Sequence, residues 1–247
     1  MIATFINAAA ILIGGLIGLL AGAFIRKNEG IQSMVFIGIG VTTLVIGTMM
    51  ALRTERILYL ALALVSGGVI GEFLGIERGI GKIGTSLHRL SLSFNQKKPL
   101  DPDNAAKGAS FVAGFLEATV LFCVGSMAIL GSIQAGLQGQ YSILLTKSVM
   151  DGFMALLLAA GLGVGVLYSA VSIIVYQGAI TLAAGLFGAS VPELVLSEIS
   201  GIGGAMILMI SLNILGLKKI PTANFLPALV IVVIFALADP ALPQVFK

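Results

Sequence analysis

Three ionisable residues lie inside long apolar stretches of this 247-residue chain: Glu117, Lys147 and Asp151. A charged side chain in such a stretch is energetically costly, so it commonly marks a site for an ion, a proton or a polar solute. Glu117 lies eight residues into the stretch 109–137, or ~12 Å along a helix. The sequence makes Glu117 a candidate ligand for a proton or cation; the alternative is a structural hydrogen bond to a neighbouring helix.

Lys147 and Asp151 are four residues apart, so a helix would place both on one face, where they can pair. Two interpretations stay open at this stage. The pair can belong to a polar site in the outer third of the membrane. It can also be an ion pair at a helix end, with the Lys147 side chain extending to the membrane interface.

Uncharged polar groups and glycines complete the candidate site. Asn7 and Gln177 lie in other apolar stretches and can form hydrogen bonds between helices. The 30 residues 108–137 would form a helix of ~45 Å, longer than a bilayer core of ~30 Å. The pairs Gly125-Ser126 and Gly131-Ser132 within it can break the helix and expose backbone groups to a solute. A continuous, tilted helix is the alternative.

The amino-acid composition indicates the environment in which these residues lie. Hydrophobic residues make up 58% of the chain, charged residues 10%, and the mean hydropathy is +1.10. A soluble domain carries roughly 25% charged residues. The sequence therefore excludes an ordinary soluble enzyme, a nucleic-acid binder and a disordered chain, and it predicts an all-α, polytopic bundle of transmembrane helices.

Apolar runs of about 20 residues predict eight membrane spans, or seven if the sixth or the short last run does not cross. The runs are 2–24, 31–52, 57–74, 109–137, two within 142–187 with a turn near 165–169, 199–217 and 225–237. An N-terminus outside the cell places ten cations in inside loops and three in outside segments, as the positive-inside rule favours. The ten are Arg26, Lys27, Arg78, Lys82, Arg89, Lys97, Lys98, Lys107, Lys218 and Lys219.

The longest inside loop contains a second pattern. Apolar residues recur at helical spacing in 75–94, and Arg78, Lys82 and Arg89 fall among the polar positions. This pattern predicts a basic amphipathic helix on the membrane surface, in contact with lipid headgroups. A helix packed under the bundle is the alternative.

Weak internal similarity divides the chain into four segments. Residues 1–74 and 108–188 align as two three-helix units, with Asn7 opposite Glu117. Because three is odd, the second unit would be inverted, an arrangement found in many secondary transporters. Residues 75–107 would form the cytoplasmic helix and linker, and 189–247 two additional membrane helices.

Several kinds of chemistry are not expected. Cys123 and His88 are the only cysteine and histidine, so we predict no intrachain disulfide, no Cys/His metal cluster and no Ser-His-Asp triad. The glycines of 161–165 do not complete a nucleotide-binding motif. We therefore predict that the protein is not an enzyme and has no cofactor or metal.

Several sequence blocks resemble the bacterial domain-of-unknown-function 554 (DUF554) family of membrane proteins. They are Phe122-Cys123-Val124-Gly125-Ser126-Met127-Ala128-Ile129, Lys147-Ser148 with Asp151-Gly152, Tyr176-Gln177-Gly178, the amino-terminal Gly14-Gly15-Leu16-Ile17-Gly18 and Asn224-Phe225-Leu226-Pro227-Ala228. The resemblance covers nearly the whole chain. It implies a polytopic protein of the bacterial inner membrane and supplies no substrate.

Together these patterns predict a small-solute or ion transporter or channel, with a polar site between the two repeats. The candidate site residues are Asn7, Glu117, Gly125, Ser126, Lys147, Asp151 and Gln177. The alternative function is an oligomeric scaffold or lipid-interacting protein, with glycine ridges driving self-association. The predicted partners are membrane lipids, a small polar solute or cation and further copies of the chain, but not nucleic acid.

Overall fold

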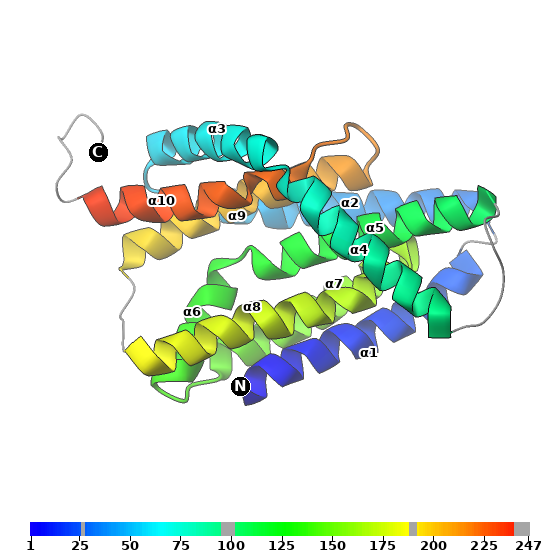
Figure 1. Ribbon diagram of the computed structural model, residues 1–247, viewed down its shortest axis with the longest axis horizontal. Coiled ribbons are helices and arrows are strands. Elements are labelled where there is room, and N and C mark those ends of the chain that lie inside the picture. Colours follow the sequence, from blue (N-terminus) through cyan, green and yellow to red (C-terminus); the bar gives the residue numbers. More distant parts are fainter. Residues whose placement is uncertain (26–27, 95–101, 188–191, 240–247) are drawn as a thin grey trace.

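A computed structural model describes residues 1–25, 28–94, 102–187 and 192–239 of the chain (Figure 1). These residues form a bundle of helices without β-strands. The elements in chain order are α1 (Ile2–Ile25), α2 (Glu29–Ala51), α3 (Ile57–Leu74), α4 (Ile76–Phe94), α5 (Pro102–Cys123), α6 (Ser126–Leu137), α7 (Ser142–Leu162), α8 (Gly165–Phe187), α9 (Glu193–Ile214), the 3-10 helix η1 (Thr222–Phe225) and α10 (Leu226–Ala238).

The predicted polytopic helical bundle is confirmed. Within the described residues, α1, α2, α3, α7, α8 and α9 are each long and apolar enough to cross a membrane. The pair α5 and α6 qualifies as a seventh, broken span with a bend of 59°. The shorter apolar segment Thr222–Ala238 corresponds to the short last run and falls below this length, so the described residues contain six to seven candidate spans where the sequence predicted seven to eight.

Contacts made by rows of glycine residues show the relative direction of neighbouring helices. Gly14 and Gly18 of α1 lie against the backbone of Gly152 and Leu156 of α7, so closely that a Cβ atom would overlap the carbonyl oxygens. Along this contact the residue numbers of α1 and of α7 increase in the same direction, so the two helices run parallel. This close backbone approach is the usual role of small residues in membrane helices.

A second ridge joins α3 to the C-terminal segment. Gly67 packs on Ala228 of α10, and Gly71 packs on the backbone of Asn224 of η1. Along this contact the residue numbers increase in α3 while those of the C-terminal segment decrease, so α3 and α10 run antiparallel. Both relationships agree with a chain that crosses the membrane in alternating directions.

The break in the long fourth run falls at the first of the two predicted Gly-Ser pairs. Gly125 has an extended backbone (φ −121°, ψ 141°) and separates α5 from α6. Gly131 and Ser132 stay inside α6 and do not break it. The next turn lies earlier than the predicted 165–169, because Gly163 adopts a positive φ of 86° that ends α7 and α8 begins at Gly165.

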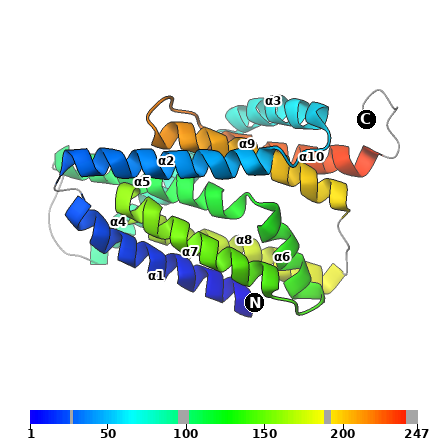
Figure 2. The same cartoon turned by 180° about the vertical axis from the view of Figure 1, so that it is seen from behind.

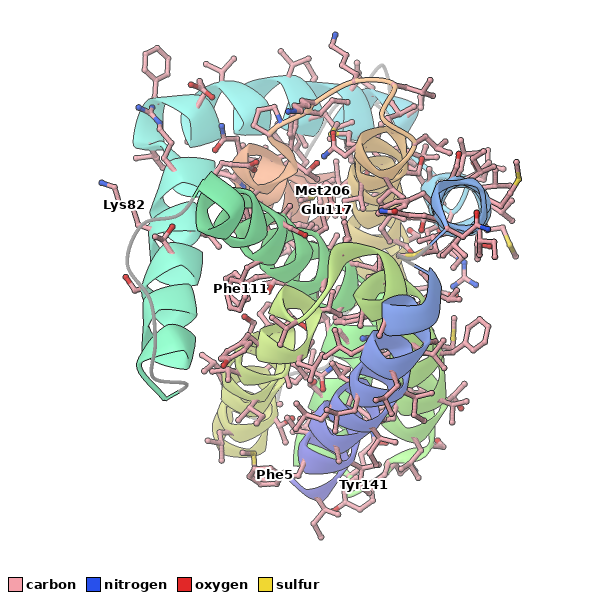
Figure 3. All side chains as sticks on the ribbon, turned by 90° about the vertical axis from the view of Figure 1, so that its right-hand side faces the viewer. Phe5, Lys82, Phe111, Glu117, Tyr141 and Met206 are labelled. Atoms are coloured by element: carbon pink, nitrogen blue, oxygen red, sulfur yellow. The ribbon has the colours of Figure 1, made fainter. Side chains whose placement is uncertain are left out.

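The predicted helix at 75–94 is confirmed as α4, which follows a left-handed Gly75 (φ 62°). Figure 1 shows α4 crossing α5 diagonally. A Cβ atom on Gly84 would lie 3.2 Å from the Phe115 ring, so the two helices are in close contact. The helix thus packs on the bundle while Arg78 and Lys82 stay exposed, and Lys82 points away from the other helices in Figure 3.

Helix α9 lies at the centre of the bundle rather than beside it. A larger share of α9 is buried than of any other candidate span in the described residues. It contacts α2, α3, α5, α6 and α10, and Figure 2 shows it between α2 and α10 from behind. The internal repeat and the four-segment division stay predictions, and in the structure α1 packs along α7 whereas α2 packs along α9.

Candidate functional site

The Lys147–Asp151 pair lies inside the bundle. Its two residues stand one turn apart on α7, form an ion pair and are 5% and 7% exposed. Lys147 therefore does not extend to the membrane interface, as the helix-end interpretation expected. A buried pair of this kind needs further hydrogen bonds to offset the desolvation of both charges.

The α5–α6 break supplies one of those hydrogen bonds. Lys147 Nζ donates to the carbonyl oxygen of Phe122 at 2.9 Å. In an uninterrupted helix this oxygen would accept from the amide of Ser126, which is instead the first residue of α6. The lysine thus occupies a backbone acceptor that the break releases, and this explains why the break and the ion pair occur together.

Asn7 and Gln177 extend the cluster to two more helices. The Asn7 side-chain amide donates to Asp151 Oδ2 at 2.9 Å and to Gln177 Oε1 at 3.3 Å. Both residues are fully buried. The cluster therefore joins α1, α5, α7 and α8, the same four runs that the sequence selected for the site.

Some hydrogen-bonding capacity of this cluster is unused. Asn7 Oδ1 and Gln177 Nε2 are buried and have no hydrogen-bond partner among the described residues. The same is true of the hydroxyls of Thr4, one turn before Asn7, and of Thr181, one turn after Gln177. Thr4 was not selected from the sequence, although its spacing from Asn7 places both on one helix face.

A cavity of about 210 Å³ adjoins the ion pair; we call it the outer cavity, after the orientation predicted from the sequence. Gly125, Ser126, Lys147 and Asp151 line it, and Ser126 Oγ lies 3.1 Å from Ser200 Oγ of α9. Its apolar lining includes five methionines, whose flexible side chains can adapt to an occupant. These are Met49, Met50, Met127, Met150 and Met154.

Glu117 lies apart from this cluster, in a larger cavity of about 890 Å³ that we call the inner cavity. Figure 3 shows Glu117 in the interior of the bundle. Its Oε2 atom is buried and makes no hydrogen bond to any residue that the structure describes. The exposed Lys219 also lines the cavity, which therefore reaches the surface near the loop between α9 and η1.

The sequence alignment of Asn7 with Glu117 suggested that both approach one region. In the structure, the hydrogen bonds of Asn7 go to Asp151 and Gln177, and Glu117 lines a cavity that Asn7 does not line. Six of the seven candidate residues thus gather at the outer cavity and its buried polar cluster, and Glu117 marks a second location.

The two cavities follow one another along the bundle. On α2 the inner cavity is lined by Phe36 and the outer one by residues from Ile46 onward. The same division occurs on α5, α7 and α9, each of which contributes one segment to each cavity. Four helices therefore frame two cavities at different depths, with α5 reaching the outer one through the break.

An apolar layer separates the cavities. On α5 the neighbours Val120 and Leu121 line opposite cavities, and on α9 Ile210 and Ile207 do so one turn apart. Leu158 of α7 lies between the two linings and is fully buried. Along the chain the two linings are adjacent on α5 and one turn apart on α9, but roughly two turns apart on α7 and roughly three on α2.

The entrance of the inner cavity is fixed by hydrogen bonds between α4 and η1. The Ala223 amide donates to Glu77 Oε2 at 2.8 Å, and the Glu77 amide donates to Asn224 Oδ1 at 2.7 Å. Burial raises the pKa of Glu77, and the nearby Glu72 acts in the same direction, whereas the bond from Ala223 lowers it. The start of α4 is thus tied to the segment that follows α9.

Glu198 is a buried carboxylate that the sequence analysis missed. It accepts hydrogen bonds from the amides of Glu55 and Arg56, at 2.7 and 2.9 Å, and from the Thr54 hydroxyl at 2.7 Å. It thereby satisfies amides that precede α3. The predicted span began at Ile199, one residue too late to include it, whereas α9 begins at Glu193.

Comparison with known proteins assigns the chain to a family. The model of the family described as "Protein of unknown function (DUF554)" matches residues 2–237. The chain belongs to the DUF554 family. No solved structure matches it.

Two DUF554 relatives are similar over almost their full lengths. The "Uncharacterized protein YqgA" of Escherichia coli (strain K12) is 30% identical over 231 residues, 94% of each chain. The "Uncharacterized membrane protein YdfK" of Bacillus subtilis (strain 168) is 32% identical over 245 residues, 96% of this chain and 97% of the relative. The DUF554 assignment agrees with the resemblance found in the sequence and with the membrane-spanning character of the helices.

The remaining predicted residues of this DUF554 protein belong to α4. Arg78 is exposed and lies 3.9 Å from Glu72, a weak surface ion pair. Lys82 is exposed, and it does not line the outer cavity. The side chain of Arg89 lies outside the described residues.

Proposed function

We propose that this DUF554 protein moves a small polar solute or an ion across the bacterial inner membrane, with its N-terminus outside the cell. The observation that carries the proposal is the succession of two cavities along α2, α5, α7 and α9, separated by buried apolar side chains that include Val120, Leu158 and Ile210. Polar groups at membrane depth on both sides of an apolar barrier are typical of transport pathways.

The buried residues have distinct roles in this proposal. Glu117 offers a carboxylate oxygen to a solute in the inner cavity. Lys147 holds the end of α5 at the break, Asp151 pairs with Lys147, and both line the outer cavity. A solute that passes the layer formed by Val120 and Ile210 would move from the first site to the second.

The transition between states needs an element that can move. The α5–α6 break is such an element, because a hinge absorbs its change in backbone angles at a few residues. Val124 and Gly125 connect the two helices, and Lys147 is the side chain that bonds to the end of α5. A shift of α5 relative to α6 would change the apolar layer without disturbing the long α1–α7 contact.

A flux assay on proteoliposomes tests the proposal. The probes are potassium, sodium, protons, methylamine and acetate, each imposed as a gradient on purified protein in bacterial lipid. We expect at least one probe to cross faster than in protein-free liposomes, and the E117Q variant to alter that flux. Liposomes that are as tight as protein-free ones to every probe would contradict the proposal.

A second candidate function is a membrane scaffold that assembles with further copies of the chain and with anionic lipid. The exposed Arg78 and Lys82 favour it, because basic side chains at a membrane surface attract anionic lipid. A stable oligomer without flux of any probe, and with binding to anionic vesicles that R78A/K82A abolishes, would favour this function over transport.

A further inference from the structure

The inner cavity has the size of an organic ligand. Its volume of about 890 Å³ lies within the ~300–1,000 Å³ of small-molecule pockets, whereas a water molecule takes up only ~30 Å³. A single dehydrated ion would contact only a small part of its walls. The cavity therefore has room for a ligand with an extended body.

The residues that line the cavity indicate the chemical character of its ligand. They are mostly apolar, with side chains contributed by α2, α5, α7 and α9. The apolar wall residues include Phe36, Val112, Leu116, Val120, Leu162 and Ile214. An aromatic or branched aliphatic group would be buried favourably against these surfaces.

Most neutral polar groups of the lining are already used within the protein. The Asn213 side chain exchanges hydrogen bonds with the backbone of Ile220, at 3.0 and 2.7 Å. The Thr85 hydroxyl donates to Gly81 O. The Glu117 side chain, in contrast, lines the cavity, and its enclosed Oε2 atom has no partner among the described residues, so its carboxylate is the strong acceptor that the cavity retains for a ligand.

The charges that face the cavity favour a cation at that acceptor. They are Glu117 of α5, Glu77 of α4 and Lys219 of the loop after α9; the lining from α2 and α7 is apolar. Lys219 is exposed, so solvent screens its charge, whereas Glu117 is partly buried and its Oε2 atom is enclosed, so its charge is screened less. A buried carboxylate gains most from a partner that donates a charged hydrogen bond.

We propose that the inner cavity binds an organic amine, with its ammonium group on Glu117 and its apolar body against the walls formed by α2, α5, α7 and α9. This inference names the solute class for the site of the proposed function and rests on that function only for its role in transport. Binding itself can be tested without it.

Three ligands with one apolar body and different head groups test the charge requirement. They are 2-phenylethylamine, 2-phenylethanol and 3-phenylpropionate. Each is titrated into the purified full-length protein in detergent, with binding followed by calorimetry and by the shift of the unfolding temperature. We expect the amine to bind at least about tenfold more tightly than the alcohol, and the carboxylate to bind least.

Two variants locate the binding. E117Q should weaken amine binding by about tenfold or more and leave the alcohol unaffected, because it removes the charge and keeps the size of the side chain. E193Q removes a charge from an exposed position of α9 and should bind like the wild type. Equal binding of amine and alcohol, or full amine binding by E117Q, would overturn the inference.

A variant that fills the cavity keeps the test valid if E117Q does not fold. Ala113 lines the inner cavity, so A113F should abolish binding of amine and alcohol alike while Glu117 is retained. Unchanged amine binding by A113F would also overturn the inference. Amine that binds as expected but crosses proteoliposome membranes no faster than protein-free ones would contradict the proposed transport function and leave the binding site standing.

Discussion

Lys147 Nζ forms an ion pair with Asp151 and also donates to the Phe122 carbonyl at the break between α5 and α6. One ammonium group therefore connects a charged pair on α7 to the end of a discontinuous helix. The relationship explains why two features that looked independent in the sequence, a Gly-Ser pair and an i, i+4 pair of charges, lie side by side in the fold. It also makes Lys147, paired with Asp151, the side chain that bonds to the end of α5 at the break.

Removal of one partner should destabilise the protein more than removal of both. K147M leaves the Asp151 carboxylate buried without its cation, a loss of about 3–5 kcal/mol for pairs of this kind. The double variant K147M/D151L removes both charges and should recover a substantial part of the loss. The free energy of unfolding of the detergent-solubilised protein measures this effect. A loss in the double variant equal to the sum of the losses in the two single variants would contradict the coupling.

The glycine ridge of α1 should not tolerate even one methyl group. A Cβ atom on Gly14 would overlap the backbone of Gly152, so G14A must separate α1 from α7, and we expect a loss of roughly 1–3 kcal/mol, as for overpacked cores. The matched control is G38A on α2, where a Cβ atom meets no heavy atom within 4 Å. G38A should be neutral or slightly stabilising, since alanine favours helices over glycine. Equal stability of both variants would contradict the described packing.

Glu198 should be important for the loop before α3. E198A leaves the partly buried amides of Glu55 and Arg56 without their protein acceptor, and we expect a loss of about 1–3 kcal/mol in total, since water can reach part of this site. E193A, at an exposed position of the same helix, is the control and should change stability by less than about 0.5 kcal/mol. Unfolding measurements on both variants decide this, and indistinguishable values would exclude the capping role.

The apolar layer between the cavities should be a barrier to ions. V120A/I210A shortens two of its side chains, so we expect proteoliposomes with this variant to lose potassium and proton gradients faster than the wild type. V171A/I234A shortens two exposed side chains of α8 and α10 and serves as the control. Gradients that persist equally in all three preparations would show that the cavities are not in line.

The sequence predicted the helices and most of the site for reasons that the structure makes clear. Apolar runs, the amphipathic pattern of α4 and the Gly-Ser break are local signals, and each is found near its predicted position. The gathering of Asn7, Lys147, Asp151 and Gln177 was predictable because polar groups at membrane depth need one another as partners.

Other features depend on how the helices pack against one another, and no local pattern in the sequence indicates them. The central position of α9 follows from contacts with α2 and α10, which no spacing along the chain indicates. Glu198 was missed because its acid group was assigned to a loop, although the structure places it in the second turn of α9. The separation of Glu117 from the ion pair depends on the thickness of the Val120–Ile210 layer, which only the assembled bundle defines.

Access to the two cavities from opposite sides of the membrane tests the central claim most directly. In a C123A background, which removes the single native cysteine, A113C places a thiol in the inner cavity and M127C places one at the outer cavity. V171C, on an exposed face of α8, is the control and should not react from either side. We expect a membrane-impermeant thiol reagent to label M127C in right-side-out vesicles and A113C in inverted vesicles. Labelling of both cysteines from the same side, or of neither from any side, would contradict a pathway through this protein.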